Sequence, residues 1–178
     1  MDFRNLKEFI LDSLKYIIVV VVVLLLFIFV VGIQQVVGPS MNPLLNEGDI
    51  IIVNKLLYRI GNINRNDVVV ISQNEKYMIK RIVGLPGEVV EYKDNYVIVD
   101  GITYKEPFLD DGVITEDFSI KDLGYDVIPE GMYLVLGDNR TNSLDSRNYG
   151  LIKRENIIGK AWVQLWPFNK IGFIQSKK

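Results

Sequence analysis

The residues of this sequence best suited to chemistry are a serine, Ser40, and a lysine, Lys80, because the chain contains no histidine and no cysteine. Without these residue types there is no Ser-His-Asp triad, no thiol nucleophile and no zinc thiolate site. The base of any hydrolytic reaction must then be a carboxylate, an amine or a metal-bound water. A serine activated by an uncharged lysine amine meets this requirement.

Ser40 lies in the segment G-P-S-M-N-P, residues 38–43. The prolines restrict the backbone on both sides of the serine, and the glycine allows a close approach or a positive φ angle. The pattern predicts a hydroxyl with a fixed direction. The same residue types are common in ordinary turns, so this segment alone fits a turn without chemistry at least as well.

Lys80 lies in an apolar run, residues 77–83, that is typical of a buried strand. Side chains alternate along a strand, so Lys80 shares a face with Met78 and Ile82, and Arg81 points to the opposite face. Burial disfavours the charged ammonium and lowers its pKa. A fall of about 2–3 units would make the amine a usable base near neutral pH. The alternative is an ordinary solvated strand lysine.

A polar loop, residues 137–150, follows the apolar run 132–136. It contains two acidic and two basic residues that can bond to one another and make the loop rigid. Such a loop could orient the lysine, as the third member of a triad orients its base. The alternative is a solvated surface loop.

The longest apolar run, residues 16–33, contains no charge. As a helix it would span roughly 27 Å, close to the thickness of the hydrocarbon core of a bilayer. A cleavable signal peptide is the alternative, but the run is long for one and no Ala-x-Ala site follows. We therefore expect a transmembrane anchor. The extended chain from Ile33 to Ser40 reaches at most about 25 Å, which would keep Ser40 near the bilayer surface.

The charges that flank this run predict its orientation. Arg4, Lys7 and Lys15 precede it, and no basic residue follows before Lys55. By the positive-inside rule, residues 1–15 are cytoplasmic and residues 34–178 lie on the outer side of the membrane.

The rest of the chain predicts one mostly β domain. Short apolar, β-rich runs are separated by turn residues, and Asp100-Gly101 between residues 96–99 and 102–104 is a strong hairpin signal. Residues 88–130 are expected to form a small inserted cap. The predicted strands are residues 50–53, 68–71, 77–83, 89–92, 96–99, 102–104, 132–136 and 161–165.

The overall charge limits the partners. The chain has 20 basic and 22 acidic residues, a formal net charge of -2, so no broad positive field is available for nucleic acid. No metal or other cofactor is expected. The sequence makes no prediction of the oligomeric state.

Taken together, the apolar N-terminal run, G-P-S-M-N-P, K-R-I-V-G-L-P-G-E and G-D-N-R-T-N-S-L-D-S-R resemble bacterial type I signal peptidase, also called leader peptidase. The resemblance implies an antiparallel, mostly β serine protease anchored in the bacterial cytoplasmic membrane by one helix. Its catalytic domain would lie on the outer face. It would use a Ser/Lys dyad to cleave signal peptides from secretory preproteins.

The resemblance also assigns roles to residues of the first two motifs. Ser40 is the nucleophile, and Lys80 is the general base that later protonates the leaving amine. Arg81 is a supporting neighbour of Lys80. The positioning residues around the nucleophile are Gly38, Pro39, Met41 and Pro43.

In the third motif, Ser143 matches the family serine that hydrogen-bonds to the lysine and orients it. Asp145 and Arg147, with Asp138 and Arg140, match ion pairs that stabilise the loop.

The sequence departs from the family pattern at two positions. Gly38 replaces a serine that donates its hydroxyl to the oxyanion in some members, so the backbone N–H of Ser40 must act with another donor. Thr141 stands where an aspartate is common.

The substrate would bind as an extended peptide at a sheet edge, with small residues one and three positions before the cut. Its pockets are expected beside Ser40, in residues 77–82 and near Leu144. If Val163 and Leu165 face the core, the alternating Trp162 and Trp166 face outward, toward lipid headgroups. The equally supported alternative places both tryptophans in the core.

Two other functions fit parts of the sequence. One is a single-pass membrane protein whose β domain only binds a partner, although this leaves Lys80 on an apolar face unexplained. The other is a related Ser/Lys self-cleaving regulator, which would need a DNA-binding or partner module and has little use for residues 16–33.

Overall fold

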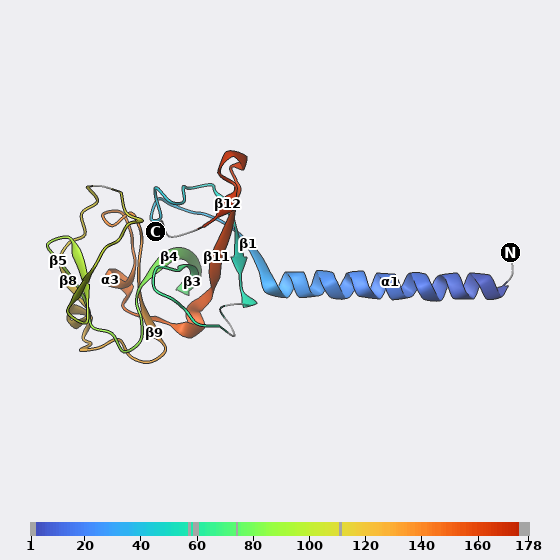
Figure 1. Cartoon of the computed structure of the whole chain (residues 1–178), viewed down its shortest axis with the longest axis horizontal. Coiled ribbons are helices and arrows are strands. Elements are labelled where there is room, and N and C mark those ends of the chain that lie inside the picture. The colour runs from blue at the N-terminus through green and yellow to red at the C-terminus, as the bar shows by residue number, and fades with distance from the viewer. Residues whose placement is uncertain (1–2, 57, 59–60, 74, 111, 175–178) are drawn as a thin grey trace.

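The computed structural model describes residues 3–56, 58, 61–73, 75–110 and 112–174, and shows a long N-terminal helix leading into a β domain (Figure 1). Helix α1, Phe3–Val30, is followed directly by strand β1, Val31–Gln35. Within the described residues, no helix meets the combined length and hydropathy expected of a membrane span. Residues 1–2 and 175–178, at the ends of the ranges predicted for the cytoplasmic and outer parts, lie outside the described residues.

The end of the helix differs from the predicted span of residues 16–33. Val31, Gly32 and Ile33 are extended and pair with strand β2, Ile50–Asn54. The last three residues of the apolar run therefore form strand pairs with β2 and do not continue the helix. This pairing begins close to the helix end, so the segment leading to Ser40 starts from an ordered strand.

The main sheet carries most of the predicted strands and is antiparallel throughout, as predicted. Over the described residues its order is β1-β2-β11-β3-β4-β9-β10, and β12 pairs with β11. The short strands β10 and β12 were not predicted, because two residues carry no periodic signal. The remaining strands are β3 Val68–Gln73, β4 Lys76–Gly84, β9 Met132–Leu136, β10 Ile152–Lys153, β11 Ile157–Trp166 and β12 Gly172–Phe173.

A second sheet, here called the cap sheet, lies within the expected insertion of residues 88–130. Its order in the described part is β7-β6-β5-β8. Asp100 and Gly101 join β6 to β7 with φ angles of 51° and 79°, as a two-residue hairpin turn requires. The strands are β5 Val90–Lys93, β6 Tyr96–Val99, β7 Ile102–Tyr104 and β8 Phe118–Ser119, followed by the 3-10 helix η1, Ile120–Leu123.

Three further short helices lie after β9. They are α3 Ser146–Tyr149, and the 3-10 helices η2 Arg154–Asn156 and η3 Phe168–Lys170.

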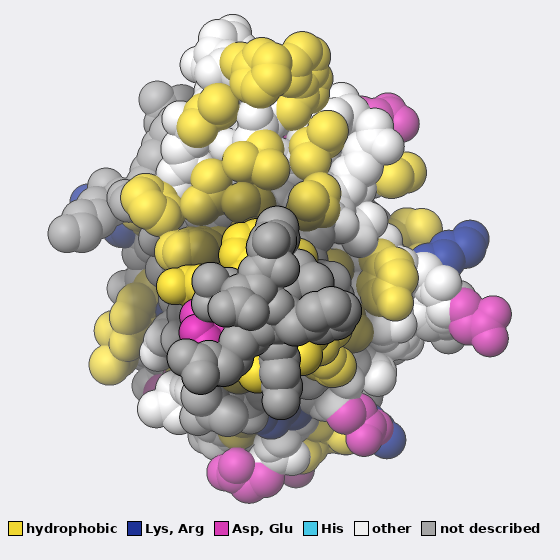
Figure 2. All heavy atoms as spheres, turned by 90° about the vertical axis from the view of Figure 1, so that its right-hand side faces the viewer, with side chains coloured by type: hydrophobic (Ala, Val, Ile, Leu, Met, Phe, Trp, Pro, Cys, Tyr) yellow, Lys and Arg dark blue, Asp and Glu magenta, His cyan; other side chains and the backbone are white. Residues whose placement is uncertain are grey.

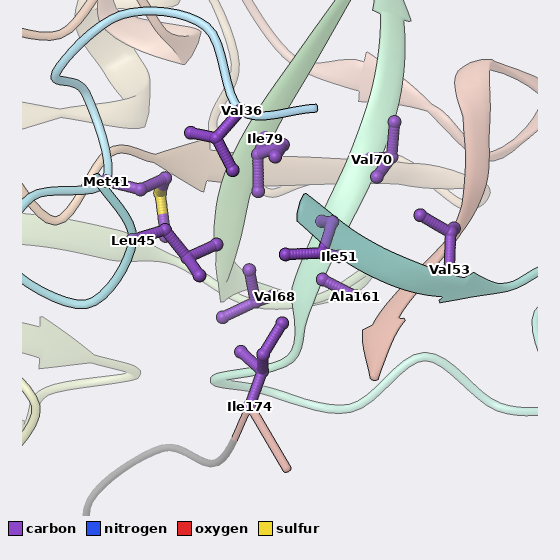
Figure 3. Close-up of a cluster of buried hydrophobic side chains, with 10 residues drawn as sticks. All are labelled: Val36, Met41, Leu45, Ile51, Val53, Val68, Val70, Ile79, Ala161 and Ile174. Carbon is purple, nitrogen blue, oxygen red and sulfur yellow. The ribbon is translucent and has the colours of Figure 1, made fainter. Parts of the chain in front are cut away.

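One buried cluster anchors the segment around Ser40 in the main sheet (Figure 3). Met41 and Leu45 point into it, with 1% and 0% of their surfaces exposed, and meet Ile79 from β4. Burial of each such side chain stabilises the fold by about 1.5–3 kcal/mol. The full cluster is Val36, Met41, Leu45, Ile51, Val53, Val68, Val70, Ile79, Ala161 and Ile174.

The sequence left open whether Val163 and Leu165 of β11 face the core, and both side chains are partly buried. Register shifts interrupt β11 between Ala161 and Val163 and again between Gln164 and Trp166. Gln164 is buried and donates to the Asp49 carboxylate at 2.7 Å. Trp162 and Trp166 are 42% and 46% exposed. Both tryptophans therefore present apolar surface outside the core, which agrees with the first of the two alternatives predicted from the sequence.

We expect Met41→Ala to lower the free energy of unfolding by about 2–5 kcal/mol, because it empties a closely packed site directly beside Ser40. Denaturant unfolding of the purified chain measures this. Val37→Ala, at an exposed position of the same segment, should change stability by less than about 0.5 kcal/mol. Equal effects of the two substitutions would contradict the packing described here.

Candidate active site

The Ser40 hydroxyl and the Lys80 amine lie in direct contact, although forty residues separate them. Lys80 Nζ is 2.7 Å from Ser40 Oγ, within ordinary hydrogen-bond distance. Ser40 comes from the turn after β1, and Lys80 from the middle of β4. The Lys80 side chain is shielded from solvent, since only 2% of the residue is exposed.

The Ser40 turn is fixed by its own hydrogen bonds and by two from the polar loop. The Asn42 N–H donates to the Pro39 carbonyl, and the Asn139 N–H donates to the Ser40 carbonyl, each at 3.0 Å. The Asn139 side-chain amide also donates to the Pro39 carbonyl at 3.2 Å. Gly38 has a φ angle of +78°, which favours glycine. These contacts hold the serine while Met41 is packed in the core.

Lys80 is buried because its strand neighbours pack in an apolar cluster. It pairs with Val69 of β3, and Val69, Ile82 and Met78 belong to the same cluster. Ile79, the residue before Lys80, belongs to a different cluster on the opposite face of β4. The predicted alternation of side chains along this strand is therefore present.

Burial is the main reason that the pKa of Lys80 falls to about 8. The negative charge of Asp145 opposes this fall, the positive charge of Arg147 adds to it, and Asp138 opposes it. The shielded amine therefore has a substantial neutral population at physiological pH, although most of it stays protonated.

Arg81, the next residue, ties β4 to the polar loop. Its guanidinium donates to both carboxylate oxygens of Asp138, at 2.8 and 2.6 Å, and to the Asn66 carbonyl at 2.9 Å. Both side chains of the ion pair are fully buried. A two-pronged, fully enclosed pair of this kind fixes the start of the loop relative to Lys80.

Asp145 and Arg147 form the ion pair expected within the loop. Arg147 donates to both Asp145 oxygens at 2.9 Å, and the Gly137 N–H donates to the same carboxylate at 3.0 Å. Although burial acts in the opposite direction, the hydrogen bonds from Arg147 and Gly137 hold the pKa of Asp145 below its usual range. Asp145 also caps α3.

The other expected loop pairing needs correction. Asp138 pairs with Arg81, and Arg140 pairs with Glu106 at 2.6 Å. Both therefore bond outside the loop, one to β4 and one to the cap. Thr141, where the family often has aspartate, lies 3.5 Å from the Asn139 side-chain oxygen.

The predicted hydrogen bond between Ser143 and Lys80 is absent. Ser143 Oγ is buried without a hydrogen-bond partner among the described residues. It does help to lower the pKa of Asp145, although no hydrogen bond of ordinary geometry joins them. Ser143 packs against Gly137, where a Cβ would lie only 2.2 Å from its oxygen. In this arrangement the lysine amine bonds to Ser40 instead.

Two cavities contain residues expected in the substrate pockets. One of about 380 Å³ is lined by Ser143, Leu144 and Arg147 from the loop and by Ile114 from the cap. The other, about 210 Å³, is lined by residues 32–34 and by Tyr77 of β4. Pro43 lines a third cavity with Leu44. Across the described residues, no group of three or more His, Cys, Asp or Glu is arranged to hold a metal ion.

Sequence reasoning did not single out Gly137, Asn139 or Glu106. The first two stand in the third motif, but nothing local indicates that Gly137 touches the Ser40 turn or that Asn139 bonds to it. Glu106 lies in a weakly patterned acidic stretch, and its bonds to Arg140 and Tyr92 join segments that no local pattern connects.

Comparison with known proteins identifies the family to which this fold belongs. The family model described as "Signal peptidase, peptidase S26" matches residues 7–166. Signal peptidase I of Bacillus caldolyticus is 41% identical over 155 residues, covering 82% of this chain and 85% of the relative. Signal peptidase IB of Staphylococcus aureus strain MRSA252 is 39% identical over 159 residues, covering 82% and 83%.

A solved structure is also similar. The crystal structure of a signal peptidase I from Enterococcus faecalis V583 has a TM-score of 0.52 and 33% sequence identity, covering 57% of this chain and 97% of that one. Together the matches define a serine endopeptidase, a hydrolase of peptide bonds. The chain belongs to the signal peptidase family, peptidase S26, which confirms the resemblance found in its motifs.

We expect Gly137→Ala to lower the rate of peptide cleavage by at least about 100-fold, because small displacements of a catalytic site have effects of this size. The new methyl group would lie 2.5 Å from the Ser40 carbonyl oxygen and 2.2 Å from Ser143 Oγ. Initial rates on a signal-peptide substrate measure the loss.

Gly172→Ala is the matched control, since the nearest atom to its added methyl is 4.0 Å away and its φ angle is not in the left-handed region. It should keep the full rate. Full activity of Gly137→Ala would contradict the close approach described here.

Proposed function

We propose that this chain cleaves signal peptides from secretory preproteins with Ser40 as nucleophile and Lys80 as general base. The observation that carries the proposal is the 2.7 Å contact between Ser40 Oγ and a buried Lys80 Nζ. With the amine neutral, the hydroxyl donates to it. A non-catalytic binding domain would leave this contact between a serine and a costly buried lysine without a reason.

The reaction follows from moving one proton. As Ser40 Oγ attacks the scissile carbonyl carbon, Lys80 takes the hydroxyl proton and becomes an ammonium. It then gives that proton to the leaving amine, so the peptide C–N bond breaks and an ester to Ser40 remains. Water, deprotonated by the neutral Lys80, attacks the ester carbonyl carbon. As the ester C–O bond breaks, Lys80 returns that proton to Ser40 Oγ, which releases the carboxylic acid product and restores the free serine and the neutral amine.

The lowered pKa makes this chemistry available at neutral pH. With a pKa of about 8, roughly a fifth of Lys80 is neutral near pH 7.4. An ordinary lysine would be about a tenth of a per cent neutral. Desolvation therefore raises the population of the active base by about two orders of magnitude.

The oxyanion would be bound by the backbone N–H of Ser40. Among the hydrogen bonds of the described residues, none uses this N–H as donor. Gly38 supplies no side-chain donor, and its positive φ angle would strain a serine there. The proposed site therefore relies on backbone donation at this position.

The substrate would bind along the edge strand β1. This strand ends the order of the main sheet and pairs with β2 on one side. An extended peptide could use the other side, with alternate side chains entering pockets. Residues 32–34 of this strand line a cavity together with Tyr77 of β4, and residues of β2, β3 and β11 complete its wall. We propose that it accepts part of the signal peptide.

We propose that the part of α1 from Tyr16 to Val30 anchors the chain in the bacterial cytoplasmic membrane, with residues 1–15 cytoplasmic and the β domain on the outer face. The described large apolar side chains between Tyr16 and Phe29 are exposed. Figure 2 shows further hydrophobic side chains on the domain face from which α1 emerges. In Figure 1, β1 and β12 lie on this side. Lipid would cover such surface at no desolvation cost.

Replacing either member of the pair should abolish cleavage. We expect Ser40→Ala and Lys80→Met each to lower kcat/KM at least about 1,000-fold on a preprotein substrate. Lys153→Met removes a lysine whose side chain is 60% exposed, and should leave the rate unchanged. Near wild-type cleavage by either site variant would sink the proposed mechanism.

The rate should rise with pH, because only the neutral form of Lys80 can accept the serine proton. We expect kcat/KM to climb about tenfold per pH unit below pH 7 and to level off above the Lys80 pKa of about 8. Measurement from pH 6 to 10 tests this. A profile flat across pH 6 to 9 would exclude Lys80 as the base.

Brominated lipids should quench the fluorescence of Trp162 and Trp166 when the full chain is reconstituted in vesicles. Single Trp→Phe variants identify the contribution of each residue. The absence of quenching for both would remove lipid contact by this face of the domain.

A further inference from the structure

The polar loop, residues 137–150, is attached to the cap through one fully buried arginine. Arg140 donates to both oxygens of Glu106, at 3.0 and 2.6 Å, and to Thr115 Oγ1 at 2.9 Å. Its Nε donates to the Gly137 carbonyl at 3.1 Å. One guanidinium thus joins two residues of the cap to the residue that abuts the Ser40 turn.

Glu106 is held by a second cap residue. The Tyr92 hydroxyl donates to Glu106 Oε1 at 2.8 Å, and the ring of Tyr92 lies 5.2 Å from the Arg140 guanidinium carbon. Burial raises the pKa of Tyr92, so the hydroxyl keeps its proton and remains a donor. The glutamate therefore accepts hydrogen bonds from both Tyr92 and Arg140.

The cap also covers Arg81, the arginine of β4 that pairs with the loop. The Phe108 ring lies 3.9 Å from the guanidinium carbon of Arg81. Arg81 is the residue after Lys80 and pairs with Asp138 of the loop. Cap residues thus enclose both of the buried arginines that join the loop to its surroundings.

Two short paths lead from Arg140 to the catalytic pair. On one path, the Gly137 carbonyl accepts from Arg140 while the Gly137 N–H donates to Asp145. On the other, Arg147 donates to the Arg140 carbonyl at 2.8 Å. Displacement of Arg140 would therefore move Gly137, against which the Ser40 turn packs, and the Asp145–Arg147 pair that faces Lys80.

We propose that Glu106 is a positioning residue of the peptidase site, through which the cap holds the polar loop against Ser40 and Lys80. This inference rests on the proposed function. It gives the cap a task in catalysis: the cap supplies the acceptor that keeps a buried guanidinium in place. Without that acceptor, Arg140 would lose its charged partner in a site closed to water, and the loop would have to rearrange.

The test is Glu106→Gln in the full chain, reconstituted in detergent with a preprotein substrate. The variant keeps the size of the side chain and removes its charge. We expect kcat to fall roughly 10- to 100-fold with KM within about twofold, as for a site displaced by less than an ångström. Glu91→Gln is the matched control, an exposed cap glutamate one residue from Tyr92, and should keep the wild-type kcat.

The pH profile separates positioning from mere stability. The charges that face Lys80 are Asp145, Arg147 and Asp138. If the loop loosens, water reaches the amine, and the rising limb of kcat should move to higher pH in Glu106→Gln. Loss of folded protein would scale the whole profile without moving it.

Tyr92→Phe is a milder second variant that keeps the ring and removes one hydrogen bond. It should lower kcat by a smaller factor, and it serves as the test if Glu106→Gln does not fold. In addition, Glu106→Gln combined with Arg140→Lys should lose little more than the worse single variant, because the two residues act through one contact.

A wild-type kcat and pH profile for both Glu106→Gln and Tyr92→Phe would overturn the inference. A fall in kcat explained entirely by lost folded protein, with an unmoved profile, would overturn it as well. Neither result would contradict the proposed function, which is tested separately and fails if Ser40→Ala remains active.

Discussion

Removing the Lys80 amine from water is the interaction on which the proposed catalytic pair depends. An ammonium surrounded by Val69, Ile82 and Met78 is unfavourable, and this penalty lowers the pKa of Lys80 to about 8. The core around β3 and β4 supplies the stability that a buried lysine requires. The folded core thus keeps Lys80 buried, and burial raises the neutral fraction of its amine enough for it to act as a base in a chain without histidine.

The remaining polar groups keep that amine next to one hydroxyl. Two short, mostly buried ion pairs lie close to Lys80. Arg81–Asp138 joins the next residue of β4 to the polar loop, and Asp145–Arg147 lies within that loop. Their charges act on the pKa of Lys80 in opposite directions, so their main contribution is geometric. The Ser40 turn is held from two sides, by the core through Met41 and by the loop through Asn139. The cap completes this framework through Arg140.

The features predicted from the sequence are those that local patterns encode. Continuous apolar runs predicted the longer strands, and the absence of histidine together with strand alternation indicated Ser40 and Lys80. Strands β8, β10 and β12 were missed because two-residue segments become strands only when a partner is present. Strand β1 was missed because its first three residues continue the apolar run of the predicted anchor. The bulges in β11, the partner of Arg140 and the orientation of Ser143 depend on contacts between distant segments, which no local pattern records.

The most direct test of this account is the titration of the Lys80 side chain itself, followed by nitrogen NMR of lysine-labelled full-length chain in detergent, with Lys80→Met used to assign the signal. The account predicts a midpoint near pH 8. A midpoint at the ordinary lysine value, about 10.4, would show a solvated ammonium and contradict it.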